Sequence, residues 1–384
     1  MDFDLPEETR ELQRMVRDFA SQEIAPRAAQ WSENEEFPTH IFTKLGELGL
    51  MGMLVPEEYG GAGSDMVSYV AVMEELGVAD QSVASSWNAH STIATLPLLT
   101  YGTPEQKQRW LAPLARGEAI GAFGLTEPGA GSDAAGVMTT ARRADGGWCI
   151  NGAKTFITNA GTDISQGVTL LARTGHDEDG RKRFATFYVP TDTPGYSCGR
   201  NLKKLGWHAM DTRELVFEDC WVPEDHLIGE EGGGLRQFLS VLDRGRISVA
   251  ALGISLARAA LRLAITHANG RRQFGRPIAN FQSVAHKIAD IGTEYEAARW
   301  LVYRAAWLAD QGRPYSKEAA MAKLFASEVA NRAASQALQI HGGYGFVRES
   351  EISRFFADAK ILEIGEGTSE IQRNVIAKEL LDQR

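Results

Sequence analysis

The sequence of 384 residues is poor in cysteine, and its three cysteines form no CxxC pair. They are Cys149, Cys198 and Cys220. An odd and sparse set argues against the disulfide framework of a small secreted protein and favours a reducing compartment. The HExxH motif and the paired Cys/His spacings of zinc sites are missing as well, so we expect no structural metal.

Basic residues are also in short supply, since 40 Lys and Arg stand against 50 Asp and Glu and give a net charge of −10. Such a charge disfavours binding to nucleic-acid phosphates over a broad surface, so we expect no nucleic acid among the partners. A local basic pocket for a nucleotide cofactor stays compatible with it.

The sequence shows neither a targeting segment nor a long uncharged apolar run. Residues 1–8 are acidic and begin a helical pattern, unlike a signal or transit peptide. The most apolar stretch, Ile247–Ile265, contains Arg258 and Arg262, and we expect it to be too short and too charged to cross a bilayer. These absences favour a soluble, cytoplasmic protein without a membrane span.

What the sequence does contain is an α+β multidomain pattern in three zones. With 43% apolar and 23% charged residues the composition is ordinary for a globular protein, and the length suggests two or three domains. Residues 1–122 predict an N-terminal helical domain, with a capping-box pattern at Thr103–Gln106. Residues 123–231 predict short strands, and residues 232–384 predict long helices.

The middle zone predicts an antiparallel β-barrel domain. Its β-rich runs are Val137–Arg143, Trp148–Ile150, Lys154–Thr158, Val168–Arg173, Arg183–Val189 and Glu214–Val222. Turn signals punctuate them at Asp145–Gly147, Asn151–Gly152, Asp179–Gly180 and Pro194–Gly195. Short strands at this spacing, with no helices between them, indicate an antiparallel barrel or sandwich and not βαβ units.

The last zone predicts a four-helix bundle. Helical apolar spacing runs from about Leu235 to Asn269, from about Phe281 to Gln311 and from Ser316 to His341, and a shorter pattern follows Glu370. Glycine follows each long pattern, as is usual at helix C-termini. Long helices with short links form an up-and-down bundle, and we expect a ligand site where the three zones meet.

Three short patterns suggest chemistry that their context does not support. Gly195–Gly199 matches the GxSxG nucleophile elbow, but a turn precedes it and no helix pattern follows. Gly129–Ala134 matches the GxGxxG dinucleotide fingerprint, yet a strand pattern follows it, so we expect no Rossmann site. His341 ends a long helix, where a histidine more often packs or interacts with the helix terminus than catalyses a reaction.

Five other segments combine an unusual backbone with polar or aromatic side chains. Each alone is compatible with a turn, a strand end or a helix cap. In chain order they are Phe123–Asp133, Phe156–Asn159, Asp243–Arg246, Arg271–Gly275 and Ile364–Glu370. Together with Thr212–Asp219, Gln339–Gly345 and Gly365–Arg373, their order resembles the acyl-CoA dehydrogenase family over essentially the whole chain.

The resemblance implies an enzyme with an N-terminal helical domain, a middle β-barrel domain and a C-terminal four-helix bundle. Such an enzyme uses FAD to oxidise an acyl-CoA thioester to trans-2-enoyl-CoA, with hydride transfer to flavin N5. Its electrons pass to an electron-transferring flavoprotein. The resemblance also implies a homo-oligomer, which we expect to be a tetramer. An oxidase-like flavoenzyme that uses oxygen and a non-catalytic helical scaffold are the alternatives.

The resemblance assigns most of the unusual residues to FAD. Phe123, Leu125 and Thr126 would line the isoalloxazine slot, while Phe156 and Thr158 would flank its reactive edge. Some of the other groups would reach the flavin of a neighbouring subunit. The rest of the implied FAD set is Gly131, Ser132, Arg271, Gln273, Phe274, Gln282, Gln339, Gly342, Gly343, Thr368 and Glu370.

The same resemblance implies a substrate site and a catalytic base. It assigns CoA to Ser132, Asp243, Arg246 and Gly367, although Arg246 is equally compatible with a structural ion pair. Glu366 would be the base, because a closed apolar cleft raises the pKa of a carboxyl group from about 4.3 toward the value that proton abstraction needs.

Two glycines near the implied base are informative: Gly245 bears on where the base lies, and Gly365 departs from the usual family residue. Some branches carry the base where this chain has Gly245, and glycine cannot abstract a proton. Many relatives have tyrosine where this chain has Gly365. A wider pocket, for longer or branched acyl groups, is our hypothesis for that difference.

Overall fold

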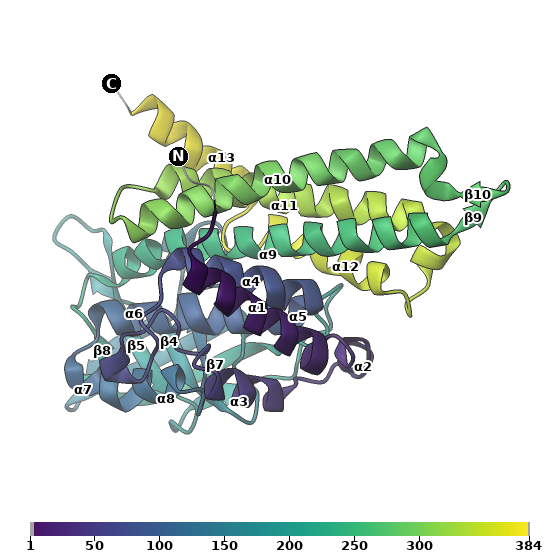
Figure 1. Ribbon diagram of the computed structural model, residues 1–384. Coiled ribbons are helices and arrows are strands. Elements are labelled where there is room, and N and C mark those ends of the chain that lie inside the picture. The colour runs from purple at the N-terminus through teal and green to yellow at the C-terminus, as the bar shows by residue number, and fades with distance from the viewer. Residues whose placement is uncertain (1–3, 383–384) are drawn as a thin grey trace.

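The computed structural model describes residues 4–382, so the helical pattern expected over residues 1–3 lies outside the described part. Helices from the two ends of the chain lie against each other, with a sheet beside them (Figure 1). The N-terminal helices are α1 Glu7–Phe19, α2 Ala28–Asn34, α3 Thr39–Glu47, α4 Met66–Ala79, α5 Gln81–Asn88, α6 Thr95–Tyr101, α7 Pro104–Gln106 and α8 Ala112–Ala115. π-helical segments extend three of them, at Ala20–Ile24, Ala89–Ala94 and Lys107–Leu111.

The capping box predicted at Thr103 is confirmed at the start of α7. The Thr103 side chain accepts a hydrogen bond from the backbone N–H of Gln106, and the Gln106 side chain accepts one from the backbone N–H of Thr103. Two donors that the helix would leave unpaired are thereby satisfied.

The central residues form a mixed sheet. Its strands are β1 Ile120–Gly124, β2 Thr140–Ala144, β3 Gly147–Thr158, β4 Ser165–His176, β5 Lys182–Pro190, β6 Tyr196–Cys198, β7 Thr212–Pro223 and β8 Leu227–Ile228. The order is β6-β7-β3-β2-β4-β5-β8, and β1 pairs with β4. Most pairs are antiparallel, but β1 and β2 run parallel to β4.

Two details of the predicted barrel are wrong. The sheet is neither wholly antiparallel nor a clearly closed barrel, because β6 and β8 stand at opposite ends of the strand order. Closure depends on which edges meet, and the sequence of one strand does not encode that. Asn151–Gly152 is not a turn either, since it lies inside β3, where a register shift opposite β7 accommodates Gly152 at φ 147°.

The C-terminal helices agree closely with their predicted ranges. They are α9 Gly234–Gly270, α10 Gln282–Asp310, α11 Ser316–His341, α12 Glu351–Ala359 and α13 Ser369–Leu381. A small hairpin of β9 Arg272–Gln273 and β10 Arg276–Pro277 joins α9 to α10. The sequence pattern did not predict α12, which packs on α9 and α11 beside the three long helices.

Helix α9 is longer and more apolar than we expected from the stretch Ile247–Ile265. Within the described residues it is the one helix long and apolar enough, by length and composition, to cross a membrane. However, 67% of its most apolar window is buried inside the protein. Burial, and not shortness or charge, therefore identifies α9 as a core helix.

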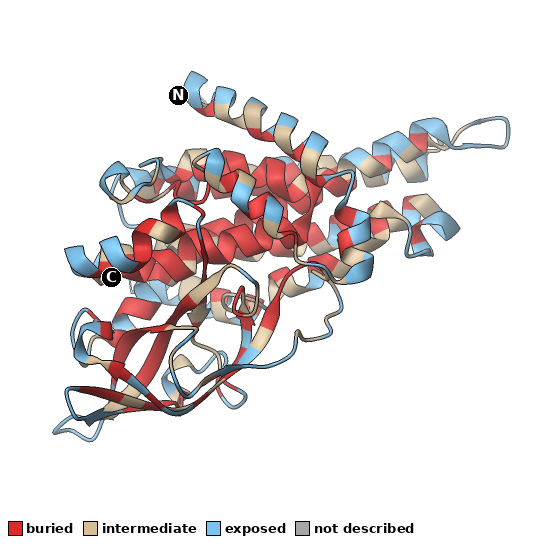
Figure 2. Cartoon of the chain, turned by 90° about the horizontal axis from the view of Figure 1, so that it is seen from below, coloured by how far each residue is buried: buried red, intermediate tan, exposed pale blue. Residues whose placement is uncertain are grey.

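The helices of both ends share one hydrophobic core. A single cluster includes Trp87 from α5, Leu252 from α9 and Val302 from α10, whereas Trp148 and Phe217 belong to a separate cluster inside the sheet. Buried positions run along the inner faces of the long helices, as Figure 2 shows in red. Within the described residues, the sheet and the long helices thus have separate main cores, with two smaller clusters beside them.

Candidate active site

Glu366 lies in the short loop between the 3₁₀ turn Lys360–Glu363 and α13. Its backbone has φ 51°, and Gly367 follows with φ 94°. A left-handed conformation is uncommon for a residue with a side chain, and such strained positions cluster at functional sites. Phe156 and Phe274, two other residues singled out from the sequence, also have positive φ, at 59° and 50°.

The two carboxylate oxygens of Glu366 have different surroundings. Oε1 accepts a hydrogen bond of 3.3 Å from Nδ2 of Asn88 in α5. Oε2 is buried and has no hydrogen-bond partner within residues 4–382. A Cβ atom at Gly245 of α9 would come within 2.2 Å of Oε2, so the missing side chain there makes room for the carboxylate. One oxygen is held while the other stays free.

Burial also determines the protonation of Glu366. Loss of solvation raises the pKa of this carboxyl group to about 8. The charges of Lys323 and Arg246 and the hydrogen bond from Asn88 oppose that rise. A carboxyl group with this pKa gains its basic form as the pH rises toward 8, which is the range in which a general base is effective.

Lys323 of α11 forms a hydrogen bond with the loop that carries Glu366. Its side chain is fully buried, and Nζ donates a hydrogen bond of 2.6 Å to the carbonyl oxygen of Gly367. Nε2 of Gln372 donates to the same oxygen at 2.9 Å. Burial lowers the pKa of Lys323 to about 8. The sequence analysis assigned no role to either residue: Lys323 belongs to no motif, and Gln372 lies in the Gly365–Arg373 segment only as part of the resemblance.

Thr368 and Glu370, predicted to contact FAD, stand at the start of α13. The Thr368 side chain is the N-cap and accepts a hydrogen bond of 3.3 Å from the backbone N–H of Ile371. Glu370 is exposed in the first turn, where backbone and Thr368 hydrogen bonds lower its pKa. Within the chain, both residues stabilise the helix terminus.

Arg246 and Asp243 lie on α9 within one turn of Gly245. Nη1 of Arg246 forms an ion pair with Oδ1 of Asp243, which also accepts a 3.1 Å hydrogen bond from Oγ of Ser316. Nε of Arg246 is buried without a hydrogen-bond partner in the described part of the chain. The structural ion pair weighed from the sequence is therefore present, and one donor remains for a ligand.

The residues expected around the flavin meet where β3 passes the end of β1. The backbone N–H of Thr155 donates to the carbonyl oxygen of Thr126 at 2.9 Å. A register shift between Lys154 and Ile157 turns Phe156 outward, and its side chain is 67% exposed. Phe123 packs differently, because its ring stacks on Phe238 of α9 at 4.4 Å between centroids.

The glycine-rich loop after β1 is fixed by a buried ion pair that the sequence did not reveal. Nζ of Lys154 donates to Oε1 of Glu127 at 2.8 Å and to the carbonyl oxygen of Leu125 at 3.0 Å. Glu127 also accepts hydrogen bonds from the backbone N–H groups of Met138 and Thr139. The predicted ligands Gly131 and Ser132 are exposed at the tip of this anchored loop.

The remaining predicted FAD ligands lie elsewhere. They surround the β9–β10 hairpin, which Figure 1 shows at the end of the bundle away from the sheet. Phe274 at the hairpin tip is 92% exposed, and the Arg271 guanidinium lies 5.4 Å from the centre of the Tyr344 ring. These predicted ligands are all exposed and lie apart from the Glu366 site. They are Arg271, Gln273, Phe274, Gln282, Gln339, Gly342 and Gly343.

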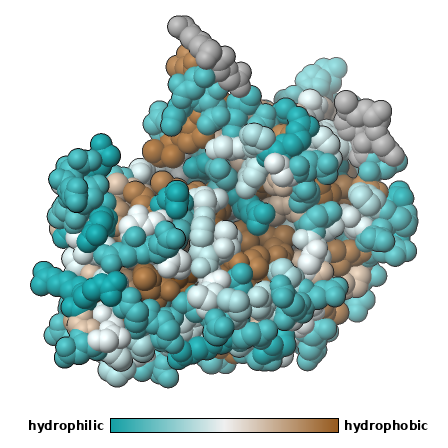
Figure 3. All heavy atoms as spheres, turned by 90° about the vertical axis from the view of Figure 1, so that its left-hand side faces the viewer, coloured by the Kyte–Doolittle hydropathy of each residue, from teal (hydrophilic) through white to brown (hydrophobic). Residues whose placement is uncertain are grey.

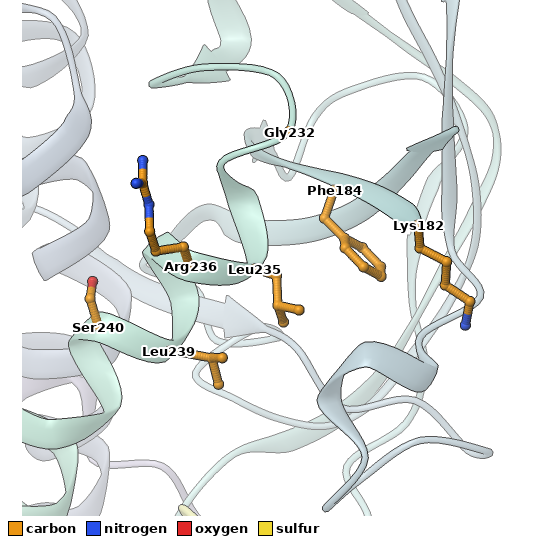
Figure 4. A pocket seen from close by; sticks show the side chains of 7 residues that line it. All are labelled: Lys182, Phe184, Gly232, Leu235, Arg236, Leu239 and Ser240. Carbon is orange, nitrogen blue, oxygen red and sulfur yellow. The ribbon is translucent and has the colours of Figure 1, made fainter. Parts of the chain in front are cut away.

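A groove between β5 and the start of α9 was not predicted. It has a volume of about 580 Å³ and is lined by Lys182, Phe184, Gly232, Leu235, Arg236, Leu239 and Ser240. Figure 4 shows Phe184, Leu235 and Leu239 around one space, with Lys182 at its edge. The left-hand side of the molecule in Figure 1 carries apolar patches bordered by hydrophilic side chains (Figure 3). Nζ of Lys182 also donates to Ala135 in the glycine-rich loop at 3.0 Å.

Polar atoms near Phe156 fit a flat cofactor with a polar edge. Oδ1 of Asn159 and Oγ1 of Thr212 are buried without hydrogen-bond partners within residues 4–382. Thr212 pairs with Thr158 in the sheet and Asn159 directly follows Thr158, so both residues lie at the end of β3 that carries Phe156. Buried polar groups normally find partners, and a bound ligand would supply them here.

Comparison with known proteins identifies the class to which this fold and site belong. Models of the acyl-CoA dehydrogenase N-terminal, middle and C-terminal domains match residues 6–118, 122–220 and 232–381. The chain therefore belongs to the acyl-CoA dehydrogenase family. It is an oxidoreductase and a flavoprotein of fatty-acid metabolism, and its cofactor is FAD.

Individual relatives match over almost the whole chain. A probable acyl-CoA dehydrogenase of Bacillus subtilis, YngJ, is 49% identical over 99% of this chain and 100% of its own. Butyryl-CoA dehydrogenase from Megasphaera elsdenii is 39% identical with a TM-score of 0.95, covering 99% of this chain and 100% of that one. A chain in a structure of the electron transferring flavoprotein of Acidaminococcus fermentans is 40% identical with a TM-score of 0.95, at the same coverage.

Proposed function

We propose that the protein dehydrogenates an acyl-CoA thioester to trans-2-enoyl-CoA, with Glu366 as the base that removes the α-proton. The observation that carries this proposal is the buried Glu366 carboxylate, with one oxygen held by Asn88 and the other free beside Gly245. The family carries its base at position 366 or at position 245, and these two positions face the same space. In this chain only Glu366 can place a carboxylate there. FAD, when bound, accepts the hydride that leaves the β-carbon.

The chain's own residues support a division of labour along the cofactor and substrate. The hydroxyl groups of Thr126 and Thr158 and the Phe156 ring would hold the flavin edge. Asp243, Arg246, Ser132 and the Gly367 backbone would hold the thioester end of CoA. The strained loop keeps the free oxygen of Glu366 aimed at one place, which is the orientation that proton abstraction requires.

The groove between β5 and α9 fits the phosphate-bearing end of CoA. Lys182 and Arg236 supply positive charge at its edge, whereas Phe184, Leu235 and Leu239 supply an apolar wall. It lies next to the start of the helix that carries Asp243 and Arg246, so one extended ligand would follow α9 from the groove toward Glu366.

The separated residues of the hairpin support a shared cofactor site. Because they lie apart from the Glu366 site in one chain, we propose that they complete the FAD site of a second copy and that two such dimers form a tetramer. Exposure of Phe274 is consistent with this, since a ring left in solvent gains from burial at an interface. We place the domain limits at 1–122, 123–231 and 232–384.

The electron acceptor and the acyl group are also proposals. Similarity to a chain from an electron-transferring flavoprotein structure supports such a flavoprotein as acceptor, with oxygen as the alternative. Similarity to a butyryl-CoA dehydrogenase supports a short acyl group, whereas Gly365 leaves space, because a Cβ there would meet only Ile361 at 3.5 Å. Cytoplasmic location remains our expectation.

A panel of short, long and branched acyl-CoA thioesters tests this function. The purified, yellow protein is mixed with each thioester without oxygen, and bleaching of the bound flavin is followed. We expect rapid bleaching by at least one thioester and reoxidation that is faster with an electron-transferring flavoprotein than with air. A protein that binds FAD but is bleached by none of them would contradict the proposal.

A further inference from the structure

Asn88 is the one side chain that donates a hydrogen bond to the Glu366 carboxylate within the described residues. It is the last residue of α5, is buried, and directly precedes the π-helical segment Ala89–Ala94. No motif singled it out, and it contributes nothing to the sheet or to the groove. Its amide is polar, buried and aimed at the carboxylate that the reaction uses.

The orientation of the Asn88 amide is fixed from its other side. The Tyr69 hydroxyl of α4 donates to Oδ1 of Asn88 at 3.1 Å. Oγ1 of Thr92 approaches the same oxygen at 3.3 Å, while its shorter bond of 2.8 Å goes to the Asn88 carbonyl. Burial, together with the charge of Glu366, raises the pKa of Tyr69 well above its usual value, so the hydroxyl keeps its proton. With Oδ1 facing hydroxyl donors, the NH₂ group must face Glu366.

Tyr69 is itself held in place. Its ring stacks on Trp87 with centroids 4.5 Å apart and planes 12° apart. Nε1 of Trp87 donates to the carbonyl oxygen of Leu50 at 2.9 Å. The chain of contacts from Trp87 through Tyr69 to Asn88 therefore ends on a rigid part of the helical core.

We propose that Asn88 is a positioning residue, which holds Oε1 of Glu366 so that Oε2 is free to take the substrate proton and which favours the ionised carboxylate. This inference rests on the proposed function of Glu366. A hydrogen bond donated to a carboxylate is stronger than one donated to its protonated form, so the bond acts on both orientation and ionisation.

Other charges also act on Glu366, and they define what removal of the Asn88 donor would change. Lys323 reaches the loop from α11, Arg246 faces it from α9, and Tyr69 stands behind Asn88 on α4. The two cations favour the ionised carboxylate, whereas burial disfavours it. Without the amide donor, the unfavourable effect of burial on the ionised carboxylate is opposed less strongly, so the apparent pKa of Glu366 rises.

Asn88→Leu tests this prediction, because leucine has a similar volume and no donor. The anaerobic rate of flavin bleaching by a substrate thioester is measured from pH 6 to pH 10 in both proteins. We expect the apparent pKa to rise by about one unit, with a loss of about tenfold at the acidic end and a smaller loss, from poorer orientation alone, at the alkaline end. An unchanged profile, or an equal loss at every pH, would overturn the inference.

Two further variants separate positioning from packing. Tyr69→Phe keeps the stacked ring and removes only the hydroxyl, so we expect a smaller rise in the apparent pKa. If Asn88→Leu does not hold FAD, Tyr69→Phe alone is the test. An unchanged apparent pKa in Tyr69→Phe would then overturn the inference. Thr95→Val removes a buried hydroxyl that bonds Ser91 and contacts neither Asn88 nor Glu366, and its profile should match the parent. Failure of the parent to bleach would instead contradict the proposed function itself.

Discussion

The sequence predicts that the Glu366 loop and the β9–β10 hairpin belong to one site, yet the structure buries the first within the chain and leaves the second exposed. Glu366 is surrounded by side chains of its own chain, from α5, α9 and α11. The hairpin is exposed at the other end of the bundle, with Phe274 almost wholly in solvent. A single chain thus builds the surroundings of the proposed base but leaves the proposed second half of the cofactor site open.

This difference indicates what each region needs from the rest of the protein. The proposed base needs burial and a fixed orientation, which one folded core provides. We expect the hairpin to need a partner surface, because exposed aromatic and arginine side chains contribute little until an interface desolvates them. Variants in the first region should therefore change chemistry, and variants in the second should change assembly and cofactor retention.

The largest of these effects is expected at Gly245. A Cβ atom there would come within 2.2 Å of Oε2 of Glu366, so Gly245→Ala must push the carboxylate aside by about 1 Å. We expect anaerobic flavin reduction to fall about 10- to 100-fold with FAD still bound. Gly365→Ala is the matched control, because its Cβ would meet only the Ile361 carbonyl at 3.5 Å. Equal rates in the two variants would show that the free oxygen is not the working one.

A smaller effect is expected at the hairpin. Phe274→Ser should weaken self-association and FAD affinity by about tenfold without changing the thermal stability of the folded chain, since this ring is 92% exposed. Leu205→Ser is the control, because that side chain is 72% exposed but lies in the loop before β7. Sedimentation and FAD titration measure both variants. A monomeric Phe274→Ser protein that retains FAD as tightly as the parent would refute the shared site.

The smallest effect concerns stability and pH. The pKa of Glu366 is raised to about 8 in the folded protein, so the unfolded chain loses this proton first as the pH rises from about 4.5. That loss destabilises the parent progressively up to about pH 8, whereas Glu366→Gln cannot lose a proton. We expect Glu366→Gln to melt about 2–4 °C above the parent at pH 9 and at the same temperature at pH 4. A constant difference at both pH values would mean that Glu366 is not titrating as described.

Much of the helical architecture could be predicted from the sequence, and the sheet topology could not. The limits of α9, α10 and α11 follow apolar spacing and terminal glycines, which act within one helix. The pairing of β1 with β4 joins segments that are far apart in the chain, so local turn signals do not encode it. Asn151–Gly152 has the composition of a turn, but pairing with β7 keeps it inside a strand.

The same limit applies to the site. Glu366 and Gly245 belong to recognisable motifs, so both were found before their contact was known. Asn88, Lys323 and the pair of Glu127 with Lys154 act through packing between elements, and no local pattern distinguishes such residues from ordinary polar ones. For Lys323, both its burial and its hydrogen bond to the Gly367 carbonyl oxygen could be identified only in three dimensions.

Anaerobic reduction of the bound flavin in the parent and in Glu366→Gln is the measurement that tests the account most directly. Glutamine keeps the shape of the side chain and lacks a basic oxygen, so we expect reduction by a substrate thioester to slow by about two to four orders of magnitude while FAD stays bound. In the parent, the rate should rise with pH and level off above about pH 8, where Glu366 is ionised. Near-normal bleaching in Glu366→Gln would contradict the assignment of Glu366 as the base.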